Sequence, residues 1–131
     1  MLEASDAALV IGDPAMTFPR ADLHVHDLAS LWYEYTGLGF VFAMWMAREG
    51  AGEVVRSVDL AGARDEGVAN LAAIVERYHS TLGLPREELM SYLRDNITFK
   101  MNDDMSRGLE LYFKLAHKHG FILSSRPLRM I

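Results

Sequence analysis

The sequence contains no cysteine. This absence excludes disulfide frameworks, cysteine-ligated zinc sites, iron–sulfur clusters and thiol nucleophiles. There is also no apolar run of about 18 residues, the length that a membrane-spanning helix needs. Basic residues are in the minority, with 13 Lys and Arg against 18 Asp and Glu, so the basic surface typical of nucleic-acid binders is missing. We therefore expect neither a membrane protein nor a nucleic-acid partner.

The motifs of several common enzyme classes are missing as well. There is no GxGxxG, no GK[ST] loop and no GxSxG elbow, so dinucleotide-binding, P-loop and α/β-hydrolase functions have no support. What remains is an ordinary globular composition, with 50% hydrophobic and 24% charged residues in a chain of 131, which fits a single domain or part of one. Residues 1–13 carry acids where a signal peptide would carry bases, which favours a cytoplasmic protein.

Residues 1–50 are predicted to form a strand, a helix and a second strand. The apolar run 7–11 is short and unalternating, as is typical of a strand buried on both faces of an α/β sheet. A bulkier run of the same kind occupies 39–45. Between the two runs, Asp27 is placed to cap a helix and Gly37 is placed to end it.

Residues 51–131 are predicted to be mainly helical, after a break at Ala51 and Gly52. Apolar side chains recur at helical spacing through most of this part, and glycines and capping residues separate the segments. Three helices are expected: one from Ser57 or Asp59 to Leu82 that Gly83 ends, a shorter one that starts at Pro85, and one that Asn102 or Asp103 caps and that ends at 118–120.

Two buried-type strands do not complete an α/β sheet, which usually has five or six strands. The strands at 7–11 and 39–45 therefore require neighbours that this sequence does not supply. We expect residues 1–131 to form a single partial domain. Either it is the C-terminal portion of a larger protein, or it completes its sheet by association.

Asp13 is the most prominent candidate for ligand binding. It directly follows the run 7–11, at the edge of the sheet where open α/β folds bind their ligands. Gly12 before it permits close approach of the backbone, and Pro14 after it begins a helical turn. The alternative is that Asp13 only caps this turn. The residues by themselves support both interpretations equally.

A second candidate site lies at the entrance to the aromatic run. Thr36 and Gly37 come just before it, and Phe40 and Phe42 lie within it. A threonine, glycines and aromatic rings are suited to form the wall of a pocket for a small ligand. The alternative is that both phenylalanines belong only to the core.

His24 and His26 are spaced i, i+2, which on an extended segment places both on one face, as two metal ligands would be. Asp27 is a candidate third ligand. No later cluster of histidines or carboxylates completes a coordination shell. No metal site is therefore predicted, and polar residues at a strand edge are the favoured interpretation.

Three stretches of the chain carry a resemblance to a known family. They are Ala-Ala-Leu-Val-Ile-Gly-Asp-Pro-Ala-Met at 7–16, Asp27-Leu28 with Trp32, and Thr-Gly-Leu-Gly-Phe-Val-Phe-Ala-Met-Trp at 36–45. In letters, order and spacing they resemble the chorismate dehydratase family of menaquinone biosynthesis. Segments between Ser91 and Ile122 also resemble that family's C-terminal helices, so the resemblance covers nearly the whole chain.

The resemblance implies an α/β, type-2 periplasmic-binding-protein-like fold of two lobes with the substrate in the cleft. This chain would be the C-terminal part of that fold, with a helical C-terminal region. The family's N-terminal lobe, which carries a Tyr-Leu-Asn motif and a serine-bearing segment, is not found in this sequence. The family's usual proline in the Thr-Gly-Leu-Pro-Phe motif is Gly39 here. The partners expected are therefore the small-molecule substrate and either that missing lobe or a second copy.

The resemblance also implies a hydro-lyase of the futalosine route, which converts chorismate to 3-[(1-carboxyvinyl)oxy]benzoate and water without a metal or organic cofactor. In such an enzyme we expect the substrate to be bound by Gly12, Asp13, Thr36, Gly37, Phe40 and Phe42. Asp13 is assigned to the substrate hydroxyls, because like charges at contact distance are costly. The catalytic base is not identified. Two alternatives remain: a non-catalytic ligand-binding fragment, and the later enzyme of the same pathway that acts on cyclic dehypoxanthinyl futalosine.

Overall fold

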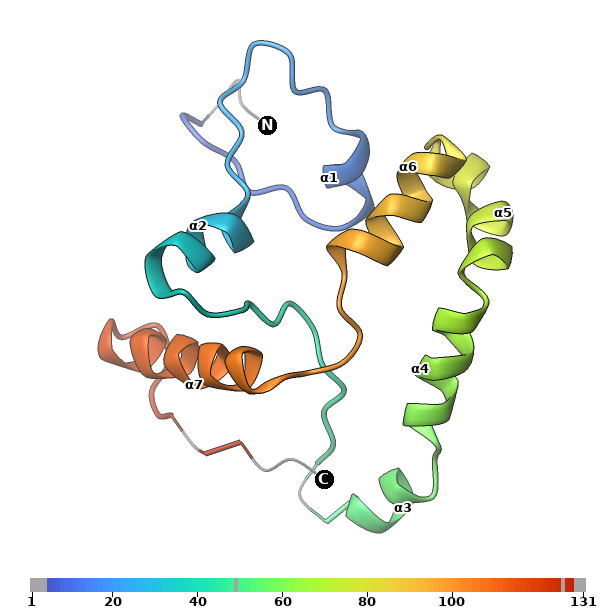
Figure 1. Ribbon diagram of the computed structural model, residues 1–131. Helices are drawn as coiled ribbons and strands as arrows, with labels where there is room; N and C mark the ends of the chain where they lie inside the picture. Colours follow the sequence, from blue (N-terminus) through green and yellow to red (C-terminus); the bar gives the residue numbers. More distant parts are fainter. Residues whose placement is uncertain (1–4, 49, 126, 129–131) are drawn as a thin grey trace. The chain divides into compact units, whose positions relative to one another are not determined.

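The computed structural model describes residues 5–48, 50–125 and 127–128 (Figure 1). The chain divides into two compact units, Met1–Val25 with Arg64–Thr98 and His26–Ala63 with Phe99–Ile131. The helical elements of the described residues are α1 (Asp13–Thr17), α2 (Leu28–Thr36), α3 (Gly52–Arg56), α4 (Leu60–Ala69), α5 (Leu71–Leu82), α6 (Arg86–Ser91), the π-helical turn η2 (Tyr92–Asn96) and α7 (Asp103–Lys118).

The first unit has a small core between α5 and α6. Val75, Leu84 and Leu89 are buried there, and Met16 of α1 is among the partly buried side chains packed against them. Gly83 ends α5 with φ 69°, a left-handed conformation that glycine adopts without strain. The predicted end of this helix is therefore confirmed, and the turn it makes lets α6 pack back on α5.

An ion pair joins the exposed faces of the same two helices. Nε and Nη2 of Arg86 donate to the two carboxylate oxygens of Glu76 at 2.7 and 2.9 Å. This pairing lowers the pKa of Glu76 and raises the pKa of Arg86, chiefly through the hydrogen bonds and then through their opposite charges. Both side chains are exposed to water, so the pair contributes little to stability.

The second unit contains α2 and α7, each begun by a capping side chain. Oδ1 of Asp27 accepts hydrogen bonds from the backbone N–H groups of Ala29 and Ser30 at 2.8 and 3.0 Å. Oδ1 of Asn102 accepts one from Met105 at 2.8 Å. The predicted beginnings of these two helices are therefore confirmed, because both follow from local capping chemistry.

The two predicted strands are not observed. Residues 7–11 and 39–45 are irregular, and no strand occurs in the part of the chain that the structure describes. Much of their apolar surface is exposed: Leu9 is 68% exposed and Trp45 85%. The physical reason is that a strand is completed by the ladder it makes with a neighbour, and these residues have no such neighbour here. The α/β fold class itself stays a prediction.

The long helix predicted up to Leu82 is divided in two. Asp59 does cap its beginning, with Oδ1 accepting from the N–H of Gly62 at 2.8 Å. Asn70 interrupts it between α4 and α5, where its side-chain amide donates to the carbonyl of Glu66 at 2.8 Å. An asparagine that bonds the backbone in this way competes with the helical ladder. A short helix, α3, also forms where a break was expected, and α6 begins one residue after Pro85.

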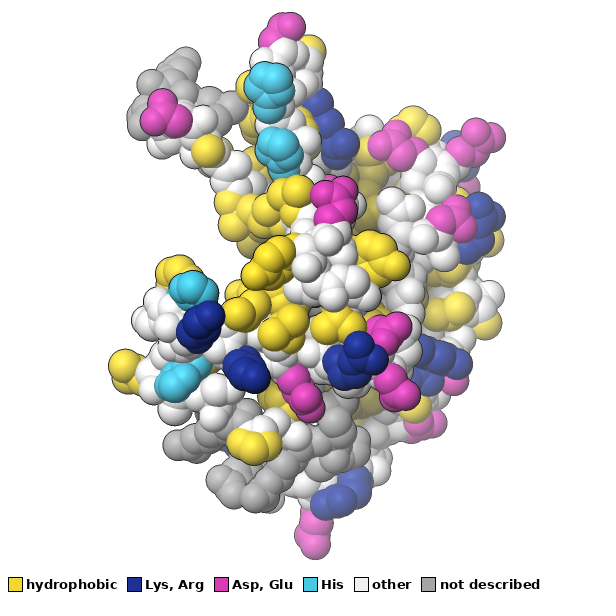
Figure 2. All heavy atoms as spheres, turned by 60° about the vertical axis from the view of Figure 1, so that its left-hand side comes forward, with side chains coloured by type: hydrophobic (Ala, Val, Ile, Leu, Met, Phe, Trp, Pro, Cys, Tyr) yellow, Lys and Arg dark blue, Asp and Glu magenta, His cyan; other side chains and the backbone are white. Residues whose placement is uncertain are grey.

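Many large apolar side chains remain exposed, and Figure 2 shows them on one face as yellow side chains between charged ones. Only four of the described hydrophobic residues are buried: Val75, Leu84, Leu89 and Leu109. Extended exposed apolar surface usually marks a surface that another element covers. Among the described residues, no helix combines the length and the apolar character that crossing a membrane requires.

Candidate functional site

The residues predicted to bind a ligand fall into both units. Gly12 and Asp13 belong to the first unit. The others, Thr36, Gly37, Phe40 and Phe42, belong to the second. The first set lies at the beginning of α1, and the second lies at the end of α2 and in the segment that follows it.

In the first unit, Gly12 occupies the N-cap position that the sequence suggests for Asp13. Gly12 is the N-cap of α1, with φ 69° and ψ −156°, and its carbonyl accepts from the N–H of Ala15 at 2.9 Å. Asp13 is the first helical residue, and its exposed carboxylate has no hydrogen bond within the described residues. The interpretation of Asp13 as a cap is therefore wrong, because the glycine's backbone conformation occupies the capping position. The carboxylate is free to contact a ligand.

In the second unit, Thr36 and Gly37 end α2 together. The hydroxyl of Thr36 donates to the carbonyl of Trp32 at 2.7 Å and accepts from the N–H of Leu38 at 3.1 Å. Gly37 takes φ 68°, and its N–H donates to the carbonyl of Tyr33 at 2.7 Å. A hydroxyl has one proton and two lone pairs. Thr36 therefore keeps one lone pair, with which it can accept a hydrogen bond from a ligand hydroxyl but not donate one to a carboxylate.

Phe40 and Phe42 belong to an aromatic cluster, defined here as Trp32, Phe40, Phe42 and Tyr112. The ring centroid of Phe40 lies 5.7 Å from that of Trp32, 4.9 Å from Phe42 and 5.6 Å from Tyr112, all in edge-to-face geometry. Such pairs are each worth about 0.5–1.5 kcal/mol beyond the apolar area they bury. Phe40 is partly buried in the cluster, whereas Phe42 is 76% exposed.

Two members of this cluster carry polar groups that make no hydrogen bond within the described residues. One is the buried Nε1 of Trp32, and the other is the hydroxyl of Tyr112. Tyr112 is 44% exposed, so its hydroxyl is available to a ligand. The sequence does not single out Tyr112, which lies on one face of α7. Nothing local in the sequence indicates that this face meets Phe40.

A close approach of two glycines brings that face to Phe40. Gly108 of α7 is buried, and a Cβ added to it would overlap the carbonyl oxygen of Gly39 and lie 3.4 Å from Cβ of Leu38. In the reverse direction, a Cβ on Gly39 would meet Cγ of Met105 at 2.8 Å. The segment before Phe40 therefore lies directly against α7, a contact that only glycine at 108 permits.

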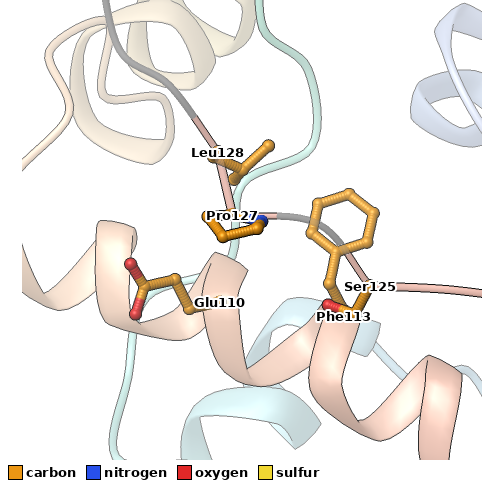
Figure 3. A pocket seen from close by; sticks show the side chains of 5 residues that line it. All are labelled: Glu110, Phe113, Ser125, Pro127 and Leu128. Carbon is orange, nitrogen blue, oxygen red and sulfur yellow. The ribbon is translucent and has the colours of Figure 1, made fainter.

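Open hollows occur elsewhere in the described part of each unit. One of about 320 Å³ lies in the second unit, where Glu110 and Phe113 of α7 meet Ser125, Pro127 and Leu128 of the following segment (Figure 3). The other, of about 410 Å³, lies in the first unit beside Glu76 and Arg86. Neither is lined by a residue that the sequence predicted to bind a ligand.

Among the described residues, no third ligand joins the histidine pair. His24 and His26 are exposed, and the carboxylate of Asp27 is engaged in capping α2. Across the described ranges, no group of three or more histidine, aspartate or glutamate side chains could hold a metal ion.

Comparison with known proteins identifies a family and a curated relative of this chain. A family model described as menaquinone biosynthesis matches residues 1–118. A chorismate dehydratase from Thermus thermophilus is 30% identical over 130 residues, which cover 86% of this chain and 48% of that enzyme. The chain thus spans about half the length of this curated relative. No solved structure matches it.

Proposed function

The chain belongs to the menaquinone biosynthesis family, and from this premise we propose that it serves as a chorismate dehydratase. The reaction proposed is the loss of water from chorismate to give 3-[(1-carboxyvinyl)oxy]benzoate, in the futalosine route to menaquinone. The single observation that carries the proposal is the 30% identity to the Thermus chorismate dehydratase over 86% of this chain. The family match over residues 1–118 supports the same biosynthetic role.

The proposal includes a need for further protein. Because the chain covers 48% of its relative, we expect turnover only when the remaining part of the enzyme is present. The fold proposed is a two-lobe, periplasmic-binding-protein-like α/β fold in which this chain forms the C-terminal part. The exposed apolar runs 7–11 and 39–45 support this, since such segments are stabilised when neighbouring strands cover them.

The chemistry assigns different tasks to the candidate residues. The reaction removes a ring hydrogen and a hydroxyl group as water, and a carbon–carbon double bond forms, which makes the ring aromatic. The free carboxylate of Asp13 suits a contact with a substrate hydroxyl, because contact with the substrate carboxylates would be repulsive. Chorismate has one alcohol hydroxyl with one proton to donate, so the remaining lone pair of Thr36 is the alternative acceptor for that same group. The rings of Phe40 and Phe42, which lie edge to face, provide an apolar wall for the substrate ring.

Reconstitution tests the proposal. The chain is mixed with the separately produced part of the Thermus enzyme that it does not match, and chorismate is followed by chromatography and mass spectrometry. We expect the mixture to form a product lighter than chorismate by one water, at a rate that neither part reaches alone. The control is the same mixture with this chain heat-denatured.

Two other outcomes would each favour a different function for this chain. Chorismate binding without turnover in every mixture would favour a non-catalytic ligand-binding fragment, the alternative that the 48% coverage supports. Consumption of cyclic dehypoxanthinyl futalosine in place of chorismate would favour the later enzyme of the pathway. Both substrates are therefore offered to the same preparations.

A further inference from the structure

The presence of a glycine at position 108 of α7 is not explained by helix propensity. Gly108 lies in the interior of a 16-residue helix, where glycine is less favourable than alanine. It is also buried, and the nearest atom to an added Cβ would be the carbonyl oxygen of Gly39. A backbone oxygen cannot rotate away as a side chain does. Glycine at 108 is therefore required by the contact between α7 and the segment before Phe40.

This contact determines which rings meet. Phe40 directly follows Gly39, and Tyr112 lies at i+4 from Gly108, on the same face of α7. The two rings are 5.6 Å apart, and each also contacts Trp32, at 5.7 and 6.0 Å between centroids. The separation of the two backbones at Gly39 and Gly108 thus sets where the ring of Phe40 is held.

We propose that Gly108 is a positioning residue, which acts through Phe40 on the wall of the chorismate site. The inference rests on the proposed function for the identity of the ligand, but the positioning can be measured without any ligand. A side chain at 108 pushes residues 38–40 away from α7 and separates Phe40 from Tyr112. An alanine at Gly39 should do less, because the atom it meets, Cγ of Met105, belongs to a flexible side chain.

The test uses Trp32 as a probe. The sequence has two tryptophans, so the change Trp45→Phe, at a position 85% exposed, leaves Trp32 as the only one. In this background Gly108→Ala and Gly39→Ala are compared with the control Gly67→Ala. Gly67 lies in α4 with no atom within 4 Å of an added Cβ. The readouts are the near-UV circular dichroism and emission maximum of Trp32, the far-UV helix signal, and chorismate affinity in the reconstituted mixture.

We expect Gly108→Ala to keep the helix signal, to change both Trp32 signals and to weaken chorismate binding at least about tenfold, the scale of losing one well-placed contact. Gly39→Ala should change the same readouts in the same direction but less, and Gly67→Ala should change none of them. Trp32 signals in Gly108→Ala that equal those of the control would overturn the inference. If Gly108→Ala loses its helix signal, the Gly39→Ala variant becomes the deciding test. Unchanged Trp32 signals in Gly39→Ala would then overturn the inference.

The two failures are distinguishable. A preparation that never binds chorismate refutes the proposed function, whereas altered Trp32 signals in Gly108→Ala still support the positioning of Phe40. Normal chorismate binding by Gly108→Ala, in a preparation whose parent binds chorismate, refutes the positioning role and leaves the proposed function intact.

Discussion

Replacing one buried and one exposed leucine tests how the first unit is stabilised. Leu89 is 3% exposed and packs with Val75 and Leu84. Changing a buried leucine to alanine costs about 2–5 kcal/mol, depending on how far the surroundings collapse into the space left. Because the other residues around this core are only partly buried, they can collapse readily. We therefore expect Leu89→Ala to lower the free energy of unfolding by about 2–3 kcal/mol, in the lower part of that range.

Leu9 is the matched control, with the same side chain in the same unit. It is 68% exposed in the run 7–11. An exposed leucine of this kind should cost no more than about 0.5 kcal/mol when changed to alanine. A buried strand over the same residues predicts instead a loss similar to that of Leu89→Ala. The ratio of the two losses therefore measures whether residues 7–11 are covered in solution.

Urea denaturation followed by circular dichroism gives both free energies, and repeating it at several protein concentrations detects association. We expect a large loss for Leu89→Ala, a small loss for Leu9→Ala, and light scattering that reveals self-association through the exposed apolar surface. Equal losses in a concentration-independent monomer would refute the reasoning, because residues 7–11 would then be buried within the chain itself.

Three further predictions concern single groups. Asp13→Ala should lower chorismate turnover of the reconstituted enzyme by at least about 10²-fold with little change in melting temperature, since the carboxylate makes no capping bond; turnover at the parent rate would remove Asp13 from the site. Chelators should leave stability and ligand binding unchanged, and stoichiometric zinc that is lost with His24→Ala would contradict this. The ion pair with Arg86 lowers the pKa of Glu76. The stability that this pair contributes is therefore present above the unfolded pKa of about 4.3, and it is lost as pH falls through the lower folded pKa. Glu76→Gln should therefore reduce the acid-induced loss of stability in a pH series of thermal melts, and an unchanged pH dependence would show that the pair has no energetic role.

Features that depend on a few neighbouring residues can be predicted from the sequence alone. Asp27 and Asn102 cap helices because a side-chain oxygen reaches a backbone N–H two or three residues ahead. Gly37 and Gly83 end helices because each adopts a positive φ at no steric cost. The motifs at 7–16 and 36–45 also identified the family, which the match over residues 1–118 shows.

Features that depend on residues distant in sequence become visible only in the three-dimensional structure. The runs 7–11 and 39–45 have the composition of buried strands, but composition cannot supply the neighbouring ladder, and in the described chain they stay irregular. The contact of Gly39 with Gly108, and with it the meeting of Phe40, Trp32 and Tyr112, joins segments far apart along the chain. No local propensity encodes such a contact, because it depends on the space between two backbones and not on the preference of either residue.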